Sequence, residues 1–214
     1  MCSTKGGDAT KNVDPNSLAD IENDANKKAF WESEANQKTL SSLQPLSAYN
    51  GADFNVVMLV GGFGVMFDFF PNADIDRVSR ECYENNNGVI GAVCHGPIGL
   101  ASIKLSNGDA LVKGKNVAGF TDGEEDVFGL GKYYPTDVYP TTGFTVETIL
   151  KELGANYSKV DNWGVNVVTD GRIVSGQNPA SADGVGEAIV AVVDADAEAE
   201  DEAGVEGVHA EGVG

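Results

Sequence analysis

The chain has 214 residues, of which 42% are hydrophobic and 8% aromatic, and its formal net charge is −19 at pH 7. This length and composition predict a soluble globular protein, most simply with one domain, and no apolar run approaches the roughly 20 residues that span a bilayer. The charge argues against nucleic acid as a partner, because phosphates repel such a surface. The start, MCSTKGGDAT, resembles neither a secretory signal nor a mitochondrial presequence, so we expect a cytosolic location.

The amino-terminal part of the chain is polar and then helical. Residues 14–46 predict short helices separated by capping residues, with Trp31 and Leu40 as packing anchors. The apolar run Val56–Val60 predicts a strand that is buried on both faces, as in a parallel sheet. A glycine-rich turn, VGGFG at residues 60–64, follows this strand.

The middle of the chain alternates helix and strand. Residues 71–88 predict an amphipathic helix whose inner side carries Ile75, Val78, Cys82 and Tyr83. A second buried strand, Val89–Val93, leads into Cys94, and a helix is expected from about Pro97 because proline is tolerated in a first helical turn. The stretch ALVKGKNVAGFT predicts short strand segments around a turn at Lys113-Gly114-Lys115.

Three elements follow. TVETILKELG predicts a helix capped by Thr145 and ended by Gly154. NVVTDGRIVSG predicts a hairpin with Asp170-Gly171 at its turn, and residues 178–193 predict a closing helix. Strands that alternate with helices indicate an α/β layered fold with a mainly parallel sheet.

The domain is expected to cover residues 1–193, with an acidic tail over residues 194–214. From Asp194 the tail has eight acidic residues and no Lys or Arg, which predicts a disordered, solubilising segment. Docking of the tail to a basic partner is the alternative. His209 lies in this tail and is not expected to take part in chemistry.

Cys94 is the strongest candidate for chemistry. Cys2, Cys82 and Cys94 form no CxxC pair and no zinc-ligand pattern, so no metal site is expected. Ala92-Val93-Cys94-His95-Gly96 has the small-x-nucleophile-x-Gly form of a nucleophile elbow, in which a strand turns sharply into a helix. The helix amides favour a thiolate at this point. A buried structural cysteine is the alternative interpretation.

His95 is placed to carry protons beside this thiol, since its free pKa lies near neutrality. An acidic partner would fix its tautomer, and the loop GFTDGEEDVFG offers Asp122, Glu124, Glu125 and Asp126 without selecting one. The backbone amides of residues 60–64 could form an oxyanion hole. This run has neither the ending of a P-loop nor a dinucleotide fingerprint.

These motifs resemble the PfpI-like superfamily, a group with the class I glutamine-amidotransferase-like fold. MLVGGFGVMFDF, AVCHGP, VKGKNVAGFTDGEE and IVSGQNPASA occur in the order seen there. They look most like its glutathione-independent glyoxalase and stress-chaperone branch, and the resemblance covers roughly residues 5–193.

The resemblance implies a flavodoxin-like three-layer sandwich and a homodimer. It also implies a lyase of the glyoxalase III or D-lactate dehydratase type, which converts methylglyoxal, a small 2-oxoaldehyde, to lactate without added cofactor. Carried over by motif, the catalytic residues are Cys94, His95 and Glu125, and the oxyanion donors are the amides of Gly62 and His95.

The sequence departs from the family pattern in two places. Where the family has a GGHG turn, this chain has Phe63 in place of the histidine. The chain also begins at the segment resembling STKGGDATKNVDPNSLADIEND, so the family's first strand-helix-strand, with a glutamate that hydrogen-bonds the thiol, has no match. The sequence therefore predicts a sheet without these amino-terminal strands and an open edge along Asn55–Val60. An incomplete gene product, a sheet completed by another chain, and a divergent inactive copy are the explanations considered.

A non-catalytic role is the alternative function. The open edge and the acidic tail fit a stress protein, either a holdase chaperone or a redox sensor whose thiol oxidises reversibly. An inactive fragment of the enzyme is a further alternative. A cysteine peptidase or amidotransferase comes third, because those amidotransferases use a histidine distant from the nucleophile.

Overall fold

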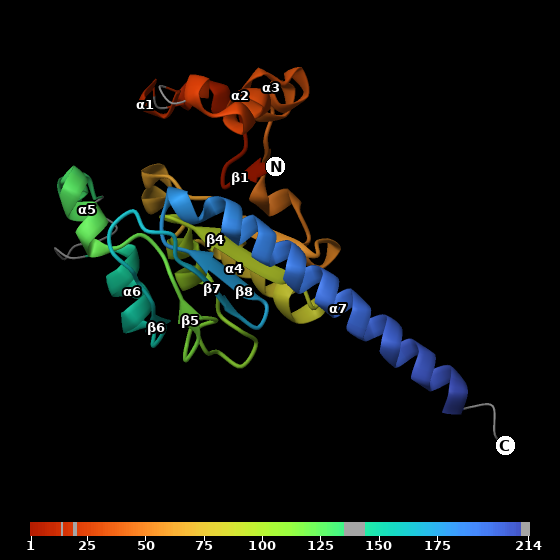
Figure 1. The fold of residues 1–214 in the computed structure, drawn as a ribbon. Coiled ribbons are helices and arrows are strands. Elements are labelled where there is room, and N and C mark those ends of the chain that lie inside the picture. The colour runs from red at the N-terminus through yellow and green to blue at the C-terminus, as the bar shows by residue number, and fades with distance from the viewer. Residues whose placement is uncertain (14, 19–20, 135–143, 211–214) are drawn as a thin grey trace. The chain divides into compact units, whose positions relative to one another are not determined.

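The computed structural model describes residues 1–13, 15–18, 21–134 and 144–210. The chain divides into two compact units, Met1–Asn50 and Gly51–Gly214 (Figure 1). The α-helices are α1 (Pro15–Leu18), α2 (Ala25–Glu32), α3 (Glu34–Leu40), α4 (Ala73–Arg80), α5 (Asp122–Phe128), α6 (Val146–Glu152) and α7 (Ala182–Ala210). The strands are β1 (Cys2–Ser3), β2 (Gln44–Pro45), β3 (Val56–Leu59), β4 (Val89–Val93), β5 (Asn116–Val117), β6 (Asn156–Tyr157), β7 (Val167–Asp170) and β8 (Ile173–Gly176). Short 3₁₀ helices cover Ala9–Asn12, Ile21–Asn23, Leu46–Ala48, Gly51–Asp53, Phe63–Phe67, Gly96–Ser102, Leu130–Tyr133 and Pro179–Ser181, and a π turn covers Glu81–Asn85.

The first unit consists of short capped helices, as predicted. The Asp24 side chain accepts hydrogen bonds at the start of α2, and the Ser33 side chain does so at the start of α3. Trp31 and Leu40 were expected to be packing anchors, but both are only half-buried. Leu43 is the buried hydrophobic residue in the described part of this unit. Helices this short cannot enclose a core by themselves.

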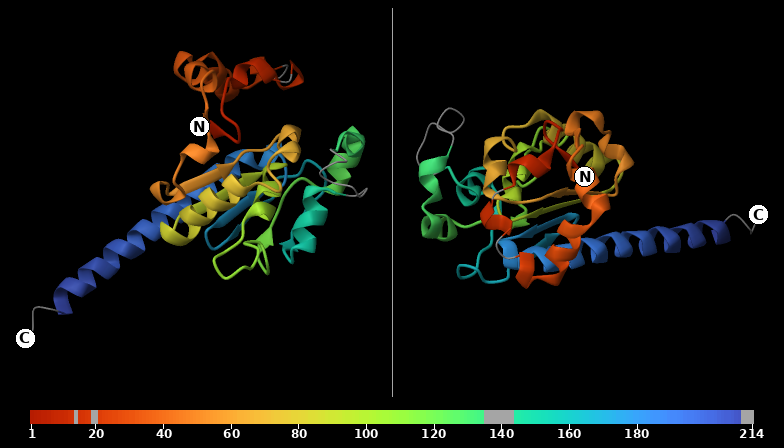
Figure 2. Two further views of the ribbon diagram at one scale, coloured as in Figure 1. Left: turned by 180° about the vertical axis from the view of Figure 1, so that it is seen from behind. Right: turned by 90° about the horizontal axis from the view of Figure 1, so that it is seen from above.

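The second unit is a layered α/β structure with a mainly parallel sheet, as predicted. Its strand order is β3-β4-β8-β7, in which β3, β4 and β8 are parallel and β7 is antiparallel to β8. Helix α7 covers one face of the sheet and α4 lies on the other (Figures 1 and 2). All five residues of β4 are buried, so this central strand lies within the three layers.

The α7 face of the sheet has an aliphatic core. Val89 and Val93 of β4 pack with Val174 of β8 and with Val185 and Ile189 of α7. The helix approaches the sheet closely, because a Cβ at Gly91 would lie 2.4 Å from Cδ1 of Ile189. This burial of aliphatic side chains holds the carboxyl-terminal helix against β4.

On the opposite face, the predicted amphipathic helix is confirmed and ends early. Ile75, Val78 and Cys82 are buried, whereas Tyr83 is half-buried. Helix α4 ends at Arg80, and a π turn completes the segment.

The prediction that the first strand is buried on both faces is wrong. In β3, Val56 and Val57 are half-buried and Met58 is 37% exposed. Within the described residues β3 pairs only with β4, so it lies at an edge of the sheet, where neighbouring layers cover less of a strand.

Three local predictions also need correction. The helix expected after Cys94 is the 3₁₀ helix Gly96–Ser102, a segment with two glycines. The strand segments expected over ALVKGKNVAGFT reduce to β5, preceded by turns. The hairpin exists, but its loop residues are Gly171 and Arg172, because Asp170 still pairs with Ile173 as the last residue of β7. The Asp170 carboxylate instead bonds Lys115 and Asn116.

The acidic segment predicted to be disordered continues α7. The helix passes Asp194 without a break and ends at Ala210; residues 211–214 lie outside the described residues. Residues 194–200 alternate acidic residues with alanine, and alanine and glutamate have high helix propensity. In the part of the chain that the structure describes, no helix combines the length and the apolar character required to cross a membrane.

The fold depends on a close backbone contact at Gly96. A Cβ there would lie 2.0 Å from the carbonyl oxygen of Leu59. We expect Gly96→Ala to lower the free energy of unfolding in urea by about 3 kcal/mol, because overpacked sites must move backbone.

Gly186 provides the matched control. It is exposed on α7, and a Cβ there would meet no atom within 4 Å. Gly186→Ala is expected to raise the free energy of unfolding by up to about 1 kcal/mol through helix propensity. Equal stability of the Gly96→Ala variant and the wild type would contradict the contact.

Candidate active site

Cys94 lies on a sharp turn between the end of β4 and the 3₁₀ helix that begins at Gly96. Its φ angle is +63°, in the left-handed region that residues other than glycine rarely adopt. Two backbone hydrogen bonds hold this conformation: Cys94 N donates to Gly176 O at 3.0 Å, and Phe120 N donates to Cys94 O at 2.8 Å. The turn thus has the strained strand-to-helix geometry of the predicted nucleophile elbow.

Two glycines let this turn lie against the end of β3. A Cβ at Gly96 would collide with the carbonyl of Leu59, and a Cβ at Gly61 would lie 2.4 Å from the carbonyl oxygen of Val93 and 2.8 Å from Cβ of Cys94. Only hydrogen fits at either position. The glycine-rich turn after β3 and the glycine after His95 therefore have one cause, the close approach of two strand ends.

The structure brings the three sequence-predicted side chains together. Sγ of Cys94 lies 3.4 Å from Nδ1 of His95, and Nε2 of His95 lies 3.0 Å from Oε1 of Glu125. The histidine and the glutamate are each 3% exposed, while Cys94 is half-buried. The carboxylate accepts the Nε2 proton, which leaves Nδ1 to exchange a proton with the sulfur or with a bound molecule.

Aromatic rings fix the plane of the His95 ring. Phe120 stacks on it with ring centroids 4.2 Å apart and an interplanar angle of 29°. Phe63 meets it edge-on at 5.6 Å and 81°. Phe63 therefore contributes an apolar wall beside His95. These contacts restrict water and hold the imidazole between Cys94 and Glu125.

The neighbours of His95 favour its charged form. Burial alone would lower the pKa of His95, but the hydrogen bonds and negative charges of Cys94 and Glu125 outweigh it and raise the pKa to about 9. At neutral pH the ring therefore carries two protons. This imidazolium lies 3.4 Å from the sulfur of Cys94.

Helix α5 presents Glu125 to this histidine. The helix starts with a capping box in which the side chains of Thr121 and Glu124 each accept a hydrogen bond from the other's backbone amide. Oε1 of Glu124 also accepts hydrogen bonds from Trp163 N, Gln177 Nε2 and Asn178 Nδ2, at 2.8, 3.1 and 2.8 Å. Burial raises the pKa of the Glu124 carboxyl, but these bonds outweigh it and lower the pKa overall. Glu124 thus ties the start of α5 to the segment after β8.

The structure separates the four acidic residues that the sequence left as candidates. Glu125 alone among them bonds His95. Asp122 accepts a hydrogen bond from the hydroxyl of Thr145, and Asp126 is exposed. The motif position four residues after Thr121 therefore falls on the side chain in contact with the histidine.

Sequence reasoning missed one residue at this site. The hydroxyl of Tyr134, which follows the 3₁₀ helix Leu130–Tyr133, donates a short hydrogen bond to Oε1 of Glu125. Its ring meets that of Phe63 at 5.5 Å. GKYYPT reads as an ordinary loop, so only the folded structure reveals this contact.

Of the two predicted oxyanion donors, His95 follows the thiol in the sequence, and Gly62 belongs to the turn after β3. Gly62, with a φ angle of +109°, precedes the 3₁₀ helix Phe63–Phe67, and Gly61 packs on Cys94. Neither the Gly62 amide nor the His95 amide donates a hydrogen bond to another described residue. Both amides are thus available to a ligand.

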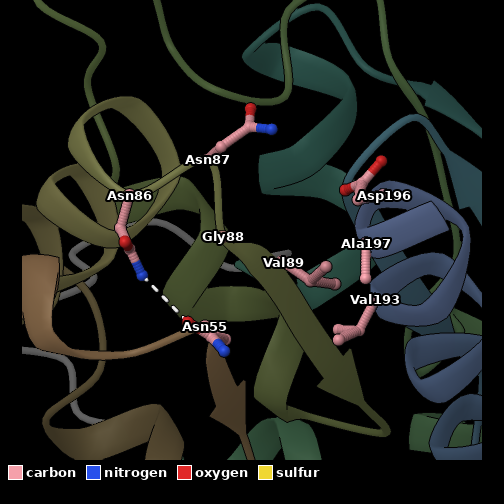
Figure 3. Close-up of a pocket in the computed structure, with 8 residues that line it drawn as sticks. All are labelled: Asn55, Asn86, Asn87, Gly88, Val89, Val193, Asp196 and Ala197. Carbon is pink, nitrogen blue, oxygen red and sulfur yellow. Dashed lines mark hydrogen bonds between the residues drawn. The ribbon is translucent and has the colours of Figure 1, made fainter. Parts of the chain in front are cut away.

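A separate pocket lies at the other end of β4. It is lined by Asn55, Asn86, Asn87, Gly88, Val89, Val193, Asp196 and Ala197 (Figure 3). Val89 begins β4 and Gly88 precedes it, whereas Cys94 follows the end of this strand, so the pocket is distinct from the thiol. No group of three His, Cys, Asp or Glu side chains within the described ranges is arranged to hold a metal ion.

The fold and this geometry define a class of protein. It is an α/β protein with a cysteine on a nucleophile elbow, in which the cysteine contacts a histidine and the histidine contacts a buried glutamate. Comparison with known families agrees. The chain belongs to the DJ-1/PfpI family, whose sequence model matches residues 43–192. Its fold is the flavodoxin-like α/β fold of that family.

Curated relatives of this chain include glyoxalases. The glutathione-independent glyoxalase HSP31 of Saccharomyces cerevisiae is 36% identical over 149 residues, which cover 68% of this chain and 60% of the relative. Glyoxalase 3 of Candida albicans is 35% identical over 156 residues, which cover 71% of this chain and 63% of the relative. The chain thus spans less than two thirds of the length of these relatives.

Solved structures show the same fold. The Rapid Encystment Protein 24 kDa of Francisella tularensis matches with a TM-score of 0.76 at 34% identity, covering 88% of this chain and 78% of that one. Glyoxalase III of Candida albicans matches with a TM-score of 0.73 at 31% identity, covering 84% and 74%.

The raised pKa of His95 makes stability depend on pH. An unfolded histidine has a pKa of about 6.5, whereas that of His95 in the fold is about 9. The stabilisation is therefore complete below pH about 6.5 and is lost as the pH rises to about 9. We expect the free energy of unfolding in urea to fall by about 1–3 kcal/mol over this range.

Two variants test this assignment. His95→Asn should remove the fall in the free energy of unfolding between pH 6.5 and pH 9, because the titrating imidazole is gone. His209→Asn, which changes the other histidine of the chain, should keep it. A fall of the same size in His95→Asn as in the wild type would show that another group titrates.

Proposed function

We propose that this protein is a glutathione-independent glyoxalase that converts methylglyoxal to lactate through a hemithioacetal on Cys94. The observation that carries the proposal is the continuous contact from Cys94 Sγ through the His95 ring to Glu125 on an elbow. The similarity to HSP31 and glyoxalase 3 supports the choice of substrate.

The proposed reaction begins with addition of the Cys94 thiolate to the aldehyde carbon. A C–S bond forms, and the carbonyl oxygen becomes an oxyanion that the amides of Gly62 and His95 stabilise. A thiolate suits this step because it is a strong nucleophile at neutral pH. His95 donates its Nδ1 proton to this oxyanion, which gives the hemithioacetal and leaves the imidazole neutral and able to accept a proton.

His95 then moves a proton between neighbouring carbons. It removes the proton from the carbon bonded to sulfur, giving an enediol, and returns a proton to the adjacent carbon. The first carbon is oxidised to a thioester while the ketone carbon is reduced to an alcohol, so no external oxidant is needed. Glu125 holds the imidazole in the orientation and tautomer that this transfer requires.

Hydrolysis completes the cycle. Water attacks the thioester carbonyl, the C–S bond breaks, and lactate leaves with the thiol restored. The Gly62 and His95 amides serve the second oxyanion as they serve the first.

The proposal predicts that the thiol is indispensable. We expect Cys94→Ser to lower glutathione-free lactate production from methylglyoxal by at least about a thousand-fold, because a hydroxyl is a weak nucleophile at this pH. Circular dichroism should remain that of the wild type. Lactate would be measured with an enantiospecific enzymatic assay.

Cys2→Ser is the matched control, since Cys2 is a free and exposed cysteine in the other unit. It should keep full turnover. Turnover by Cys94→Ser equal to that of the wild type would refute the mechanism. A folded wild-type chain without any turnover would favour a non-catalytic stress role.

We further propose a cytosolic homodimer, the assembly that the resemblance to PfpI-like proteins implies. Sedimentation equilibrium of the purified chain should then give twice the monomer mass of 22.4 kDa. A single species of monomer mass at micromolar concentration would contradict this assembly.

A further inference from the structure

One oxygen of Glu125 accepts two hydrogen bonds while the other accepts none. Oε1 lies 3.0 Å from Nε2 of His95 and also accepts the hydroxyl proton of Tyr134. Oε2 is buried and has no hydrogen-bond partner among the described residues. The histidine and the tyrosine therefore share a single acceptor atom.

Sharing this atom weakens its hold on the histidine. A hydrogen bond donated to a carboxylate stabilises the charged form and makes the carboxylate less basic. The effect is large for a buried group, because little water competes for the charge, and Glu125 is only 3% exposed. The Tyr134 hydroxyl therefore moderates the attraction between Glu125 and the His95 imidazolium.

The surroundings leave few other groups to set this attraction. Among the described residues, the titratable groups that bond the His95 ring are Cys94, on the same turn, and Glu125, on α5. The remaining ring contacts of His95 are the uncharged rings of Phe63 and Phe120.

Tyr134 is itself held in place. Its ring packs against Phe63 at 5.5 Å, and Phe63 in turn packs against His95.

We propose that Tyr134 is a positioning residue that sets, through Glu125, how tightly His95 holds its proton. It touches neither the thiol nor a reacting carbon and acts through the carboxylate. Its kinetic consequence rests on the proposed function, in which His95 must both take and release a proton in each turnover. Its electrostatic consequence rests on the geometry alone.

The first test measures the histidine directly. Because the chain has only two histidines, NMR of ring-labelled protein gives two titrations, and His209→Gln assigns them. Tyr134→Phe keeps the ring and removes the hydroxyl. The pKa of His95 should rise by about half a unit or more, since Glu125 becomes a stronger acceptor.

Tyr133→Phe is the matched control. Tyr133 is the preceding residue, 56% exposed, and its hydroxyl bonds no described residue. Its substitution should leave the His95 titration unchanged. Should Tyr134→Phe fail to fold, Tyr134→Met, which also removes the hydroxyl, must shift the pKa in the same direction. An unchanged or lowered pKa of His95 without the Tyr134 hydroxyl overturns the proposal.

A double substitution tests the route through Glu125. In a Glu125→Gln background the charge is absent, so Tyr134→Phe should no longer shift the pKa of His95. A shift of equal size in that background overturns the proposal, because it would show that the tyrosine acts on the histidine by another path.

Kinetics separate this inference from the proposed function. Tyr134→Phe should move the pH profile of kcat for methylglyoxal toward higher pH by the amount seen in NMR, with little change in KM. An NMR shift in a chain that produces no lactate would support the role of Tyr134 and refute the glyoxalase. A wild-type profile despite an NMR shift would refute the kinetic role.

Discussion

The approach of the ends of β3 and β4 is the constraint on which the site depends. The carbonyl of Leu59 lies so near the backbone of residue 96, and the carbonyl of Val93 so near that of residue 61, that glycine is required at both positions. This contact forces the chain to turn sharply after β4, and the turn places Cys94 at φ +63°. The backbone geometry thus comes first, and the chemistry of the thiol is built on it.

Two adjacent glutamates on α5, Glu124 and Glu125, have different hydrogen-bond partners. Glu124 is fully buried and bonds donors from the segments after β6 and β8, which fixes where α5 begins. Glu125 differs, because one of its oxygens accepts hydrogen bonds from His95 and Tyr134 while the other has no partner among the described residues. Both oxygens of Glu124 accept hydrogen bonds that fix the backbone around α5, whereas Glu125 directs one oxygen to the His95 ring.

The sequence predicts the parts of this structure that local pattern controls. The elbow at Cys94, the buried strand β4 and the parallel order follow from apolar runs and glycine spacing. The edge position of β3 was predicted, but the partial exposure of its faces was not. The 3₁₀ helix Gly96–Ser102 and the helical continuation of α7 past Asp194 were not predicted either, because packing against other layers and helix propensity determine them. The contact between Tyr134 and Glu125 joins a loop to a helix, and the hydrophobic periodicity of the sequence cannot predict a contact of this kind.

The left-handed conformation of Cys94 also limits what evolution can do at this position. A residue with a branched Cβ is rarely found at a positive φ, so threonine and valine are disfavoured there whatever their chemistry. Serine and alanine are unbranched and can adopt the same backbone. Position 94 can therefore exchange its cysteine for serine or alanine without disturbing the fold, whereas the backbone permits serine and resists threonine.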